Sequence, residues 1–222
     1  MIQYYHVQVI VKELKISITS EQIEISYNVA PTQTVVAIID KDDTRYCGHF
    51  RWGLIPFWMK EIPKVPLFNV RSETIAEKPS FKASFIRRRA VVPATGFFEW
   101  HKADRTPHFI YSATGDLLYL AAIYDSWEGA DGSFIPSLGI ITTAANSFMS
   151  RIHDRMPVLM QKGDIPQFLD PNNQDLKSVQ QMLAPSPEDF LQTHVVSKEV
   201  NKISNNYPEL LEEYQDIESI PL

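Results

Sequence analysis

The chain has 222 residues, of which 44% are apolar and 11% aromatic, enough to bury a sizeable core in a globular protein. Its formal net charge of −6 excludes a protein that coats nucleic acid by bulk electrostatics, because such binding needs many Lys and Arg side chains to displace counterions from phosphates. The apolar runs are far shorter than the roughly 20 residues that cross a bilayer. With no signal-peptide pattern at the start, we expect a cytoplasmic protein without a membrane span.

The predicted strands share β-branched and aromatic residues bounded by turn formers, and the predicted helices show apolar periodicity with suitable start residues. In chain order the elements are a strand at 34–40, a helix at 77–88, strands at 89–94, 107–112, 117–124 and 138–143, helices at 144–153, 163–170 and 176–184, and a strand at 193–197. Strands outnumber helices and do not alternate regularly with them. We therefore predict a single α+β domain over 1–222, with a mixed, mostly antiparallel, barrel-like sheet flanked by short helices.

Basic residues gather in one part of this acidic chain. The segment from Arg71 to Lys102 holds seven basic residues and three acidic ones, a local excess of four. Such a stripe is compatible with a focused groove for nucleic acid. It is equally compatible with a charged face that contacts only solvent.

Two polar stretches, GFFEWHK and FNVRSET, stand out in apolar surroundings. Glu99 lies among aromatic residues, which favour the protonated carboxyl and suit it for proton transfer, unless it simply faces water from a strand. Asn69 and Arg71 share one face if their segment is extended, because side chains alternate with period two. An amide beside a guanidinium suits a phosphate or a polarised oxygen. The alternative for Arg71 is a structural ion pair with Glu73.

Aromatic rings and one imidazole complete the candidates. Trp52 and Trp58, in FRWGLIPFW, could stack on bases of single-stranded nucleic acid, although most tryptophans belong to the core. His153, in IHDRMP, is a candidate general acid or base, or else a buried structural histidine. The six histidines show no paired ligand spacing and one cysteine, Cys47, cannot build a thiolate site, so we predict no metal and no cofactor.

Six stretches, taken together and in order, resemble the SOS response-associated peptidase family. They are YNVAPTQ, RWGLIPFW, NVRSET, RAVVPATGFFEWHK, IITTAAN with IHDRMPVLM, and VSKEVNKISNNYPELL, from about residue 27 to residue 211. The resemblance implies a protein that binds single-stranded DNA and processes abasic sites. In this family an N-terminal cysteine traps the ring-opened aldehyde: its amine forms a Schiff base, which the thiolate closes to a thiazolidine ring.

The resemblance also implies roles for the candidate residues. Asn69 and Arg71 would hold the cysteine region and a flanking phosphate. Glu99 would move protons during ring opening and imine formation, and His153 would act on the sugar hydroxyl or the leaving oxygen. Trp52, Trp58 and Arg155 are further candidates for contacts with DNA. We expect a monomer whose partner is single-stranded DNA with abasic sites.

One departure from the family pattern concerns the nucleophile. The family begins Met-Cys-Gly-Arg-Phe or close to it, whereas this chain begins MIQYYHVQ, with Ile2 in place of the cysteine. Cys47 lacks the free amine that thiazolidine formation needs, and we expect it to fill space in the sheet. A divergent member without crosslinking, an altered start and an unrelated use of the scaffold all fit. The alternative functions are a non-catalytic module that binds single-stranded DNA and, ranked lower because no protease triad is recognisable, a peptidase.

Overall fold

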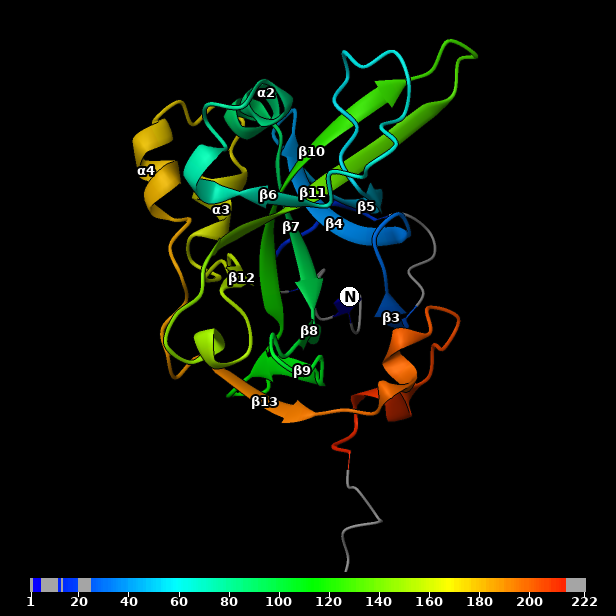
Figure 1. Ribbon diagram of the computed structural model, residues 1–222. Helices are drawn as coiled ribbons and strands as arrows, with labels where there is room; N and C mark the ends of the chain where they lie inside the picture. Colours follow the sequence, from blue (N-terminus) through cyan, green and yellow to red (C-terminus); the bar gives the residue numbers. More distant parts are fainter. Residues whose placement is uncertain (1, 5–11, 13, 20–24, 215–222) are drawn as a thin grey trace, which may run out of the picture.

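The centre of the molecule is a closed ring of five strands. The computed structural model describes residues 2–4, 12, 14–19 and 25–214. The ring runs β11–β10–β7–β4–β5 and returns to β11, with antiparallel neighbours except where β5 and β11 close it in parallel (Figure 1). Its strands are β4 (Thr34–Lys41), β5 (Thr44–Trp52), β7 (Arg89–Ala94), β10 (Leu118–Glu128) and β11 (Phe134–Ala144). The predicted α+β fold with a barrel-like, mostly antiparallel sheet is confirmed.

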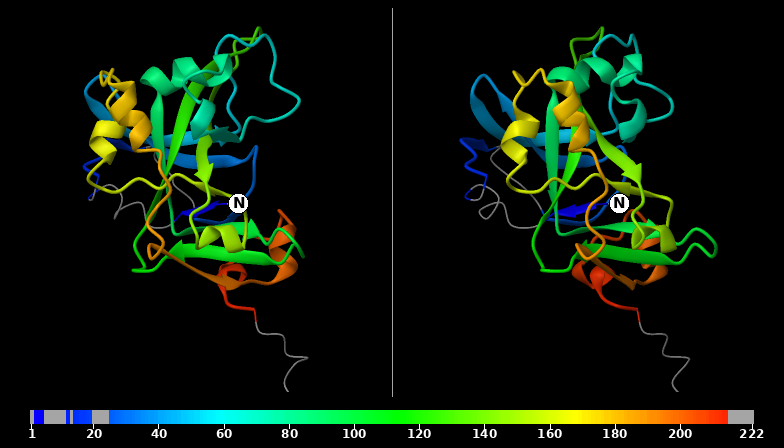
Figure 2. Two further views of the ribbon diagram at one scale, coloured as in Figure 1. Left: turned by 60° about the vertical axis from the view of Figure 1, so that its left-hand side comes forward. Right: turned by 90° about the vertical axis from the view of Figure 1, so that its left-hand side faces the viewer.

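A second sheet of five strands lies below the barrel in both views of Figure 2. Its order is β13 (Leu191–Val195), β9 (Pro107–Ser112), β8 (Gly96–Trp100), β1 (Ile2–Tyr4) and β3 (Ser26–Val29). The chain passes from β7 in the barrel to β8 in this sheet through Thr95 alone. Gly96 is needed at this crossing, because a Cβ there would collide with the carbonyl oxygen of Ile110 on β9. The two sheets are therefore joined at a tight corner.

Short elements complete the fold and pack on these sheets. The strands are β2 (Ile18–Thr19), β6 (Asn69–Arg71) and β12 (Arg155–Pro157), and the α-helices are α2 (Pro79–Arg87), α3 (Ile165–Leu169) and α4 (Leu176–Gln181). The 3-10 helices are η1 (Ser72–Thr74), η2 (Met149–Arg151), η3 (Lys198–Asn201) and η4 (Pro208–Leu211). Among the described residues, no helix combines the length and the apolar character that a membrane crossing requires.

The larger core fills the barrel and the space under α2 and α3. All six residues of β7 are buried, because the strand has barrel neighbours on both sides and helices against it. Arg89 is buried at its start, and its guanidinium donates to the carbonyl oxygens of Phe85, Ile86, Phe168 and Asp170. These carbonyl oxygens, rather than a carboxylate, compensate the buried charge of Arg89. The same bonds connect α2 and the end of α3 to the barrel.

The predicted elements are largely present, with one clear error. Each predicted strand overlaps an observed one, and the helices at 77–88, 163–170 and 176–184 correspond to α2, α3 and α4. The helix predicted at 144–153 is wrong: only η2 forms there. Asn146 holds a turn instead, since its Oδ1 accepts from the backbone N–H of Met149 at 2.9 Å and its Nδ2 donates to the Ser186 carbonyl at 3.0 Å.

Candidate functional site

A pocket of about 270 Å³ lies where the barrel meets the second sheet. Its walls come from β5, β6, β8, β10, β11 and β12, and from the loop that precedes β12. The lining residues are Trp52, Asn69, Arg71, Phe97, Phe98, Glu99, Leu120, Ile140, Thr142, His153, Arg155, Met156 and Pro157. The structure thus brings together all the candidate residues predicted from the sequence except Trp58. A larger open hollow of about 870 Å³ beside the β4–β5 turn holds none of them.

Asn69 and Arg71 reach the pocket from β6, which pairs in parallel with β11. Val70 between them is buried, so both polar side chains point to the opposite, exposed face, as the alternation predicted. Gly139 lets β6 approach this closely, because a Cβ there would lie 2.8 Å from Cγ2 of Val70. Within the part of the chain that the structure describes, neither polar side chain has a hydrogen bond or an ion pair. Both are available to a ligand.

Glu99 enters from β8 and is half-buried. Its Oε1 accepts a hydrogen bond from the backbone N–H of Trp100 at 3.1 Å. Trp100 itself packs against the small core of the second sheet, and its indole Nε1 donates to Oδ1 of Asn201 at 2.8 Å. The carboxylate therefore sits at the pocket wall rather than pointing freely into water, and it keeps an oxygen for a ligand.

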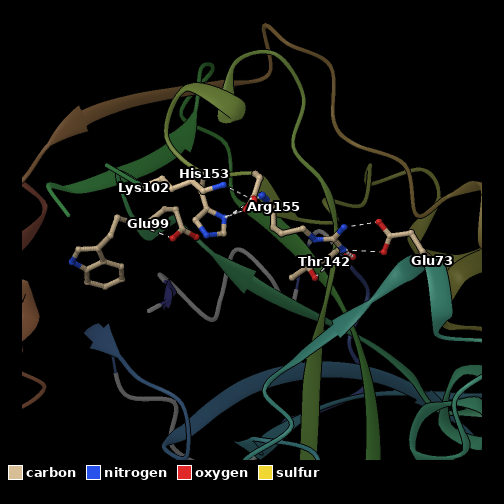
Figure 3. A network of polar contacts seen from close by, with 8 residues as sticks. Glu73, Glu99, Lys102, Thr142, His153 and Arg155 are labelled. Atoms are coloured by element: carbon tan, nitrogen blue, oxygen red, sulfur yellow. Dashed lines mark hydrogen bonds and ion pairs between the residues drawn. The ribbon is translucent and has the colours of Figure 1, made fainter. Parts of the chain in front are cut away.

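His153 lies in the loop before β12, with about a third of its side chain exposed. Its Nδ1 accepts a hydrogen bond from the backbone N–H of Arg155 at 3.1 Å, so in the neutral ring the proton resides on Nε2. Asp154 Oδ1 is 3.4 Å from the same Nδ1, and Asp154 also pairs with Lys102 at 2.8 Å. Lys102 holds the pKa of Asp154 below its ordinary value. Figure 3 shows Glu99 and His153 extending into the same region.

The side chain of Arg155 is held by Glu73 and by Thr142, and its ion pair with Glu73 is called the clamp below. Its guanidinium forms a two-pronged ion pair with Glu73, with distances of 2.5 and 3.0 Å, and Nη2 donates to the Thr142 carbonyl at 2.7 Å. Figure 3 shows this side chain extending away from His153 toward Glu73. The hydrogen bond from Arg155 is the main reason that the pKa of Glu73 lies below its ordinary value. Glu73 therefore pairs with Arg155 and not, as one alternative held, with Arg71.

The remaining candidates differ in accessibility. Trp52 is buried, and its Nε1 donates to the Phe68 carbonyl at 3.0 Å, so only part of its ring meets the pocket. Trp58 is 52% exposed in the loop between β5 and β6, beside the exposed Phe57. Cys47 is buried in β5, where desolvation raises the pKa of its thiol to about 11. Cys47 is therefore a protonated core residue and a poor nucleophile.

The backbone of residue 2 lies next to the pocket wall. In β1, Ile2 pairs with Phe97 of β8 on one side and with Val29 of β3 on the other. Phe97 lines the pocket. The fold thus places the backbone of residue 2, an isoleucine in this chain, beside the strand whose Phe97 lines the cavity.

Sequence reasoning missed two parts of the site. Thr142, at the end of a correctly predicted strand, contributes its carbonyl and lines the pocket. The clamp between Glu73 and Arg155 joins residues 82 positions apart, and no local pattern connects them. The TT pair within ITTAAN was the one signal for Thr142, since hydroxyls at a strand end are suited to binding.

The pocket combines complementary chemical groups. An unpaired amide and guanidinium can donate to the oxygens of a phosphate or a carbonyl. A carboxylate can exchange a proton with a ligand, and an imidazole that presents Nε2–H can donate a hydrogen bond to the same ligand. The apolar floor of Leu120, Ile140 and Met156 suits the carbon skeleton of a sugar more than a free ion. The arrangement suits a small ligand that carries both oxygen atoms and a carbon skeleton.

Comparisons with known proteins agree on one family. The family model for SOS response associated peptidase (SRAP) matches residues 2–203. Abasic site processing protein YoqW of Bacillus subtilis (strain 168) is 38% identical over 194 residues, which cover 85% of this chain and 86% of that protein. Abasic site processing protein HMCES of Rattus norvegicus is 32% identical over 228 residues, 84% of this chain and 64% of that protein.

Solved structures share the fold of this chain. A crystal structure of a protein from Bacteroides thetaiotaomicron has a TM-score of 0.75 at 30% identity and covers 83% of this chain and 82% of its own. Another, from Bordetella bronchiseptica, has a TM-score of 0.77 at 22% identity and covers 88% of this chain and 98% of its own, which shows the fold. The chain therefore belongs to the SOS response associated peptidase (SRAP) family.

Proposed function

We propose that this protein recognises abasic sites in single-stranded DNA and takes the sugar that lacks a base into the pocket. The observation that carries the proposal is the convergence of Asn69, Glu99 and His153, with Arg71 beside them, on one cavity of about 270 Å³. Relatives named abasic site processing proteins support the choice of ligand. An intact nucleotide would have to place its base as well, whereas a base-free sugar needs only the small polar pocket.

Arg71 and Asn69 are the groups that hold the DNA in this proposal. Arg71 donates to a phosphate next to the lesion, because its guanidinium is exposed and unpaired among the described residues. Asn69, two residues earlier on the same face, donates to an oxygen of the sugar. Trp58, exposed in the neighbouring loop, offers a ring for stacking on a base outside the pocket. Trp52 is too buried for such stacking and shapes the wall.

Glu99 and His153 carry the chemistry of ring opening. A closed abasic sugar is a hemiacetal, and its opening removes a proton from the hydroxyl at C1′ and adds one to the ring oxygen. The Glu99 carboxylate accepts the proton of the C1′ hydroxyl and returns it to the ring oxygen, while Nε2–H of His153 donates a hydrogen bond to that oxygen as its bond to C1′ breaks. The products are an aldehyde at C1′ and a free hydroxyl at C4′, so atoms and charges balance. The hydrogen bond on Nδ1 fixes the tautomer that this step needs.

We propose recognition without thiol crosslinking. Residue 2 is isoleucine, and the one cysteine of the chain is buried in β5 with its thiol protonated. A thiazolidine therefore has no thiolate to close it. A second candidate, reversible capture of the aldehyde by an amine, is distinguished by borohydride, which reduces an imine to a stable adduct. The adduct would appear as a shifted band on a denaturing gel. Cytoplasmic location and a monomeric state stay predictions.

The test is a comparison of two labelled single-stranded oligonucleotides that differ only at one abasic position. Fluorescence anisotropy should show tighter binding of the abasic oligonucleotide. The variant Asn69→Ala should remove most of this difference while it leaves binding to the intact strand little changed. Equal binding of both oligonucleotides by the wild-type protein would refute the proposal. An abasic strand within a duplex, as a third ligand, reports whether single strands are preferred.

A further inference from the structure

We propose that Glu73 determines specificity at this site by acting as an internal counterion of Arg155 that a DNA phosphate must displace. The inference rests on the proposed function and deepens it, because it assigns a role in discrimination to a residue outside the pocket lining. Glu73 would weaken binding of phosphates in general. The selective contacts within the pocket would then decide which DNA is kept.

The geometry makes Glu73 a mimic of a phosphate. Its two oxygens meet Nη1 and Nη2 of Arg155 at 2.5 and 3.0 Å, the two-pronged arrangement in which a guanidinium also binds phosphate oxygens. About half of the Glu73 side chain is exposed, and about a quarter of the Arg155 side chain. The pair thus lies at the mouth of the site, where an incoming phosphate reaches the same guanidinium edge.

Exchange of partners is feasible because Glu73, the carboxylate that must move away, is about half exposed. Ion pairs in contact with water contribute little to stability, so a phosphate that binds Arg155 has little to overcome. The guanidinium stays in place during the exchange, since Nη2 also donates to the Thr142 carbonyl at 2.7 Å. Glu73 follows β6 in the 3-10 helix η1 and can turn outward without disturbing a strand.

The charge of Glu73 matters at this position. Arg71 and Arg155 are the arginines that line the pocket; Glu73 pairs with Arg155 and attracts Arg71 more weakly through space. Without its charge, two unpaired guanidinium groups would face the DNA. Any strand, damaged or intact, would then bind more tightly, because phosphate contacts carry no information about a missing base.

The hydrogen bond that orients His153 does not depend on the charge of Glu73. The backbone N–H of Arg155, not its side chain, donates to Nδ1 of His153. The backbone of β12 is fixed by pairing with β11, where Arg155 lies opposite Ala144. A change from Glu73 to Gln should therefore alter binding while the ring-opening groups remain as they are. This separates a counterion from a residue that merely supports the site.

The experiment measures binding of the intact and abasic oligonucleotides from 50 to 200 mM salt for three variants. Glu73→Gln should bind the intact strand about threefold more tightly at low salt, with a plot of log affinity against log salt steeper by about 0.7, the value for one more phosphate contact on a single strand. The preference for the abasic strand should fall. Glu73→Asp keeps the charge and should keep the wild-type slope.

Glu77→Gln is the matched control. Glu77 is exposed, lies four residues further on and makes no side-chain hydrogen bond or ion pair among the residues described, so its change removes the same charge without freeing Arg155. If Glu73→Gln behaves like Glu77→Gln, or binds intact DNA more weakly than wild type, the inference is overturned. If the wild-type protein does not prefer the abasic strand at all, the proposed function itself fails, and the two outcomes are thereby distinguished.

Discussion

The backbone N–H of Arg155 donates to Nδ1 of His153 at 3.1 Å and thereby fixes which nitrogen of the imidazole carries the proton. Nε2–H is left for the pocket that Glu99 also lines. A carboxylate beside an imidazole held in one tautomer is prepared for a step in which the carboxylate moves a proton and Nε2–H donates a hydrogen bond to the departing oxygen.

The first prediction concerns this pair. Glu99→Gln and His153→Ala should each slow opening of the bound abasic sugar by about 100-fold, because the first removes the group that moves the proton and the second removes the hydrogen-bond donor to the ring oxygen. Dissociation constants should change much less. The rate is measured with a hydroxylamine probe that labels the aldehyde under saturating protein. Unchanged rates in both variants would favour the alternative of a non-catalytic DNA-binding module.

A second prediction concerns the exposed guanidinium on β6. Arg71→Ala should weaken binding to abasic and intact single strands alike, and the salt slope should become shallower by about 0.7, because one phosphate contact is lost. Arg87→Ala is the control, since Arg87 is exposed at the end of α2 and does not line the pocket. A loss confined to the abasic strand would show instead that Arg71 reads the lesion.

The buried thiol gives a third prediction. Because desolvation raises the pKa of Cys47 to about 11, the native protein at pH 8 should react with iodoacetamide far more slowly than the urea-unfolded protein. Mass spectrometry of the intact chain counts the added groups. Cys47→Ala should retain binding of abasic DNA. Rapid labelling of the native protein, or loss of binding in this variant, would reopen a role for the thiol.

A fourth prediction concerns pH and His108 of β9. Desolvation, with a smaller contribution from nearby His101, holds the pKa of His108 below its ordinary value of 6.5. The folded state therefore binds this proton less readily than the unfolded chain. Its contribution to stability is complete above pH 6.5 and is lost as the pH falls from there toward the lowered value.

Melting temperatures between pH 7.5 and 5 measure this effect. In His108→Gln the melting temperature should fall less as the pH is lowered, because Gln carries no titrating group. Gln can still reach the Thr193 hydroxyl, which lies 3.4 Å from Nδ1 of His108. His49→Gln serves as a control histidine, on β5 in the barrel. An identical decrease in wild type and His108→Gln would contradict the assignment.

The sequence predicted those parts of the site that depend on local pattern. The alternation in NVR placed Asn69 and Arg71 on one face, and β6 has this arrangement. The helix at 144–153 was wrong because the side chain of Asn146 bonds to the backbone of its own loop and competes with helix formation. The local pattern did not predict the strand β5, since TRYCGHFRW mixes polar and apolar residues and one of its partners, β11, lies far away in sequence.

The features of the site that the sequence did not predict depend on contacts between segments that are far apart in the chain. Trp52 and Trp58 look alike in the sequence, yet one is buried in a strand and the other exposed in a loop. The partner of Arg155 could not be chosen from its surroundings, because Glu73 approaches from a separate strand region that folding brings beside β11. Such pairings follow from how the sheets close rather than from propensity.

The narrow contact that closes the barrel has a consequence for ligand binding. β5 and β11 meet through two residue pairs, Ser137 with Arg51 and Leu138 with Trp52. Trp52 and Ile140, from the two sides of this seam, both line the pocket. A sugar bound there would contact both strands of this junction. Binding of the ligand would therefore also stabilise the closed form of the barrel.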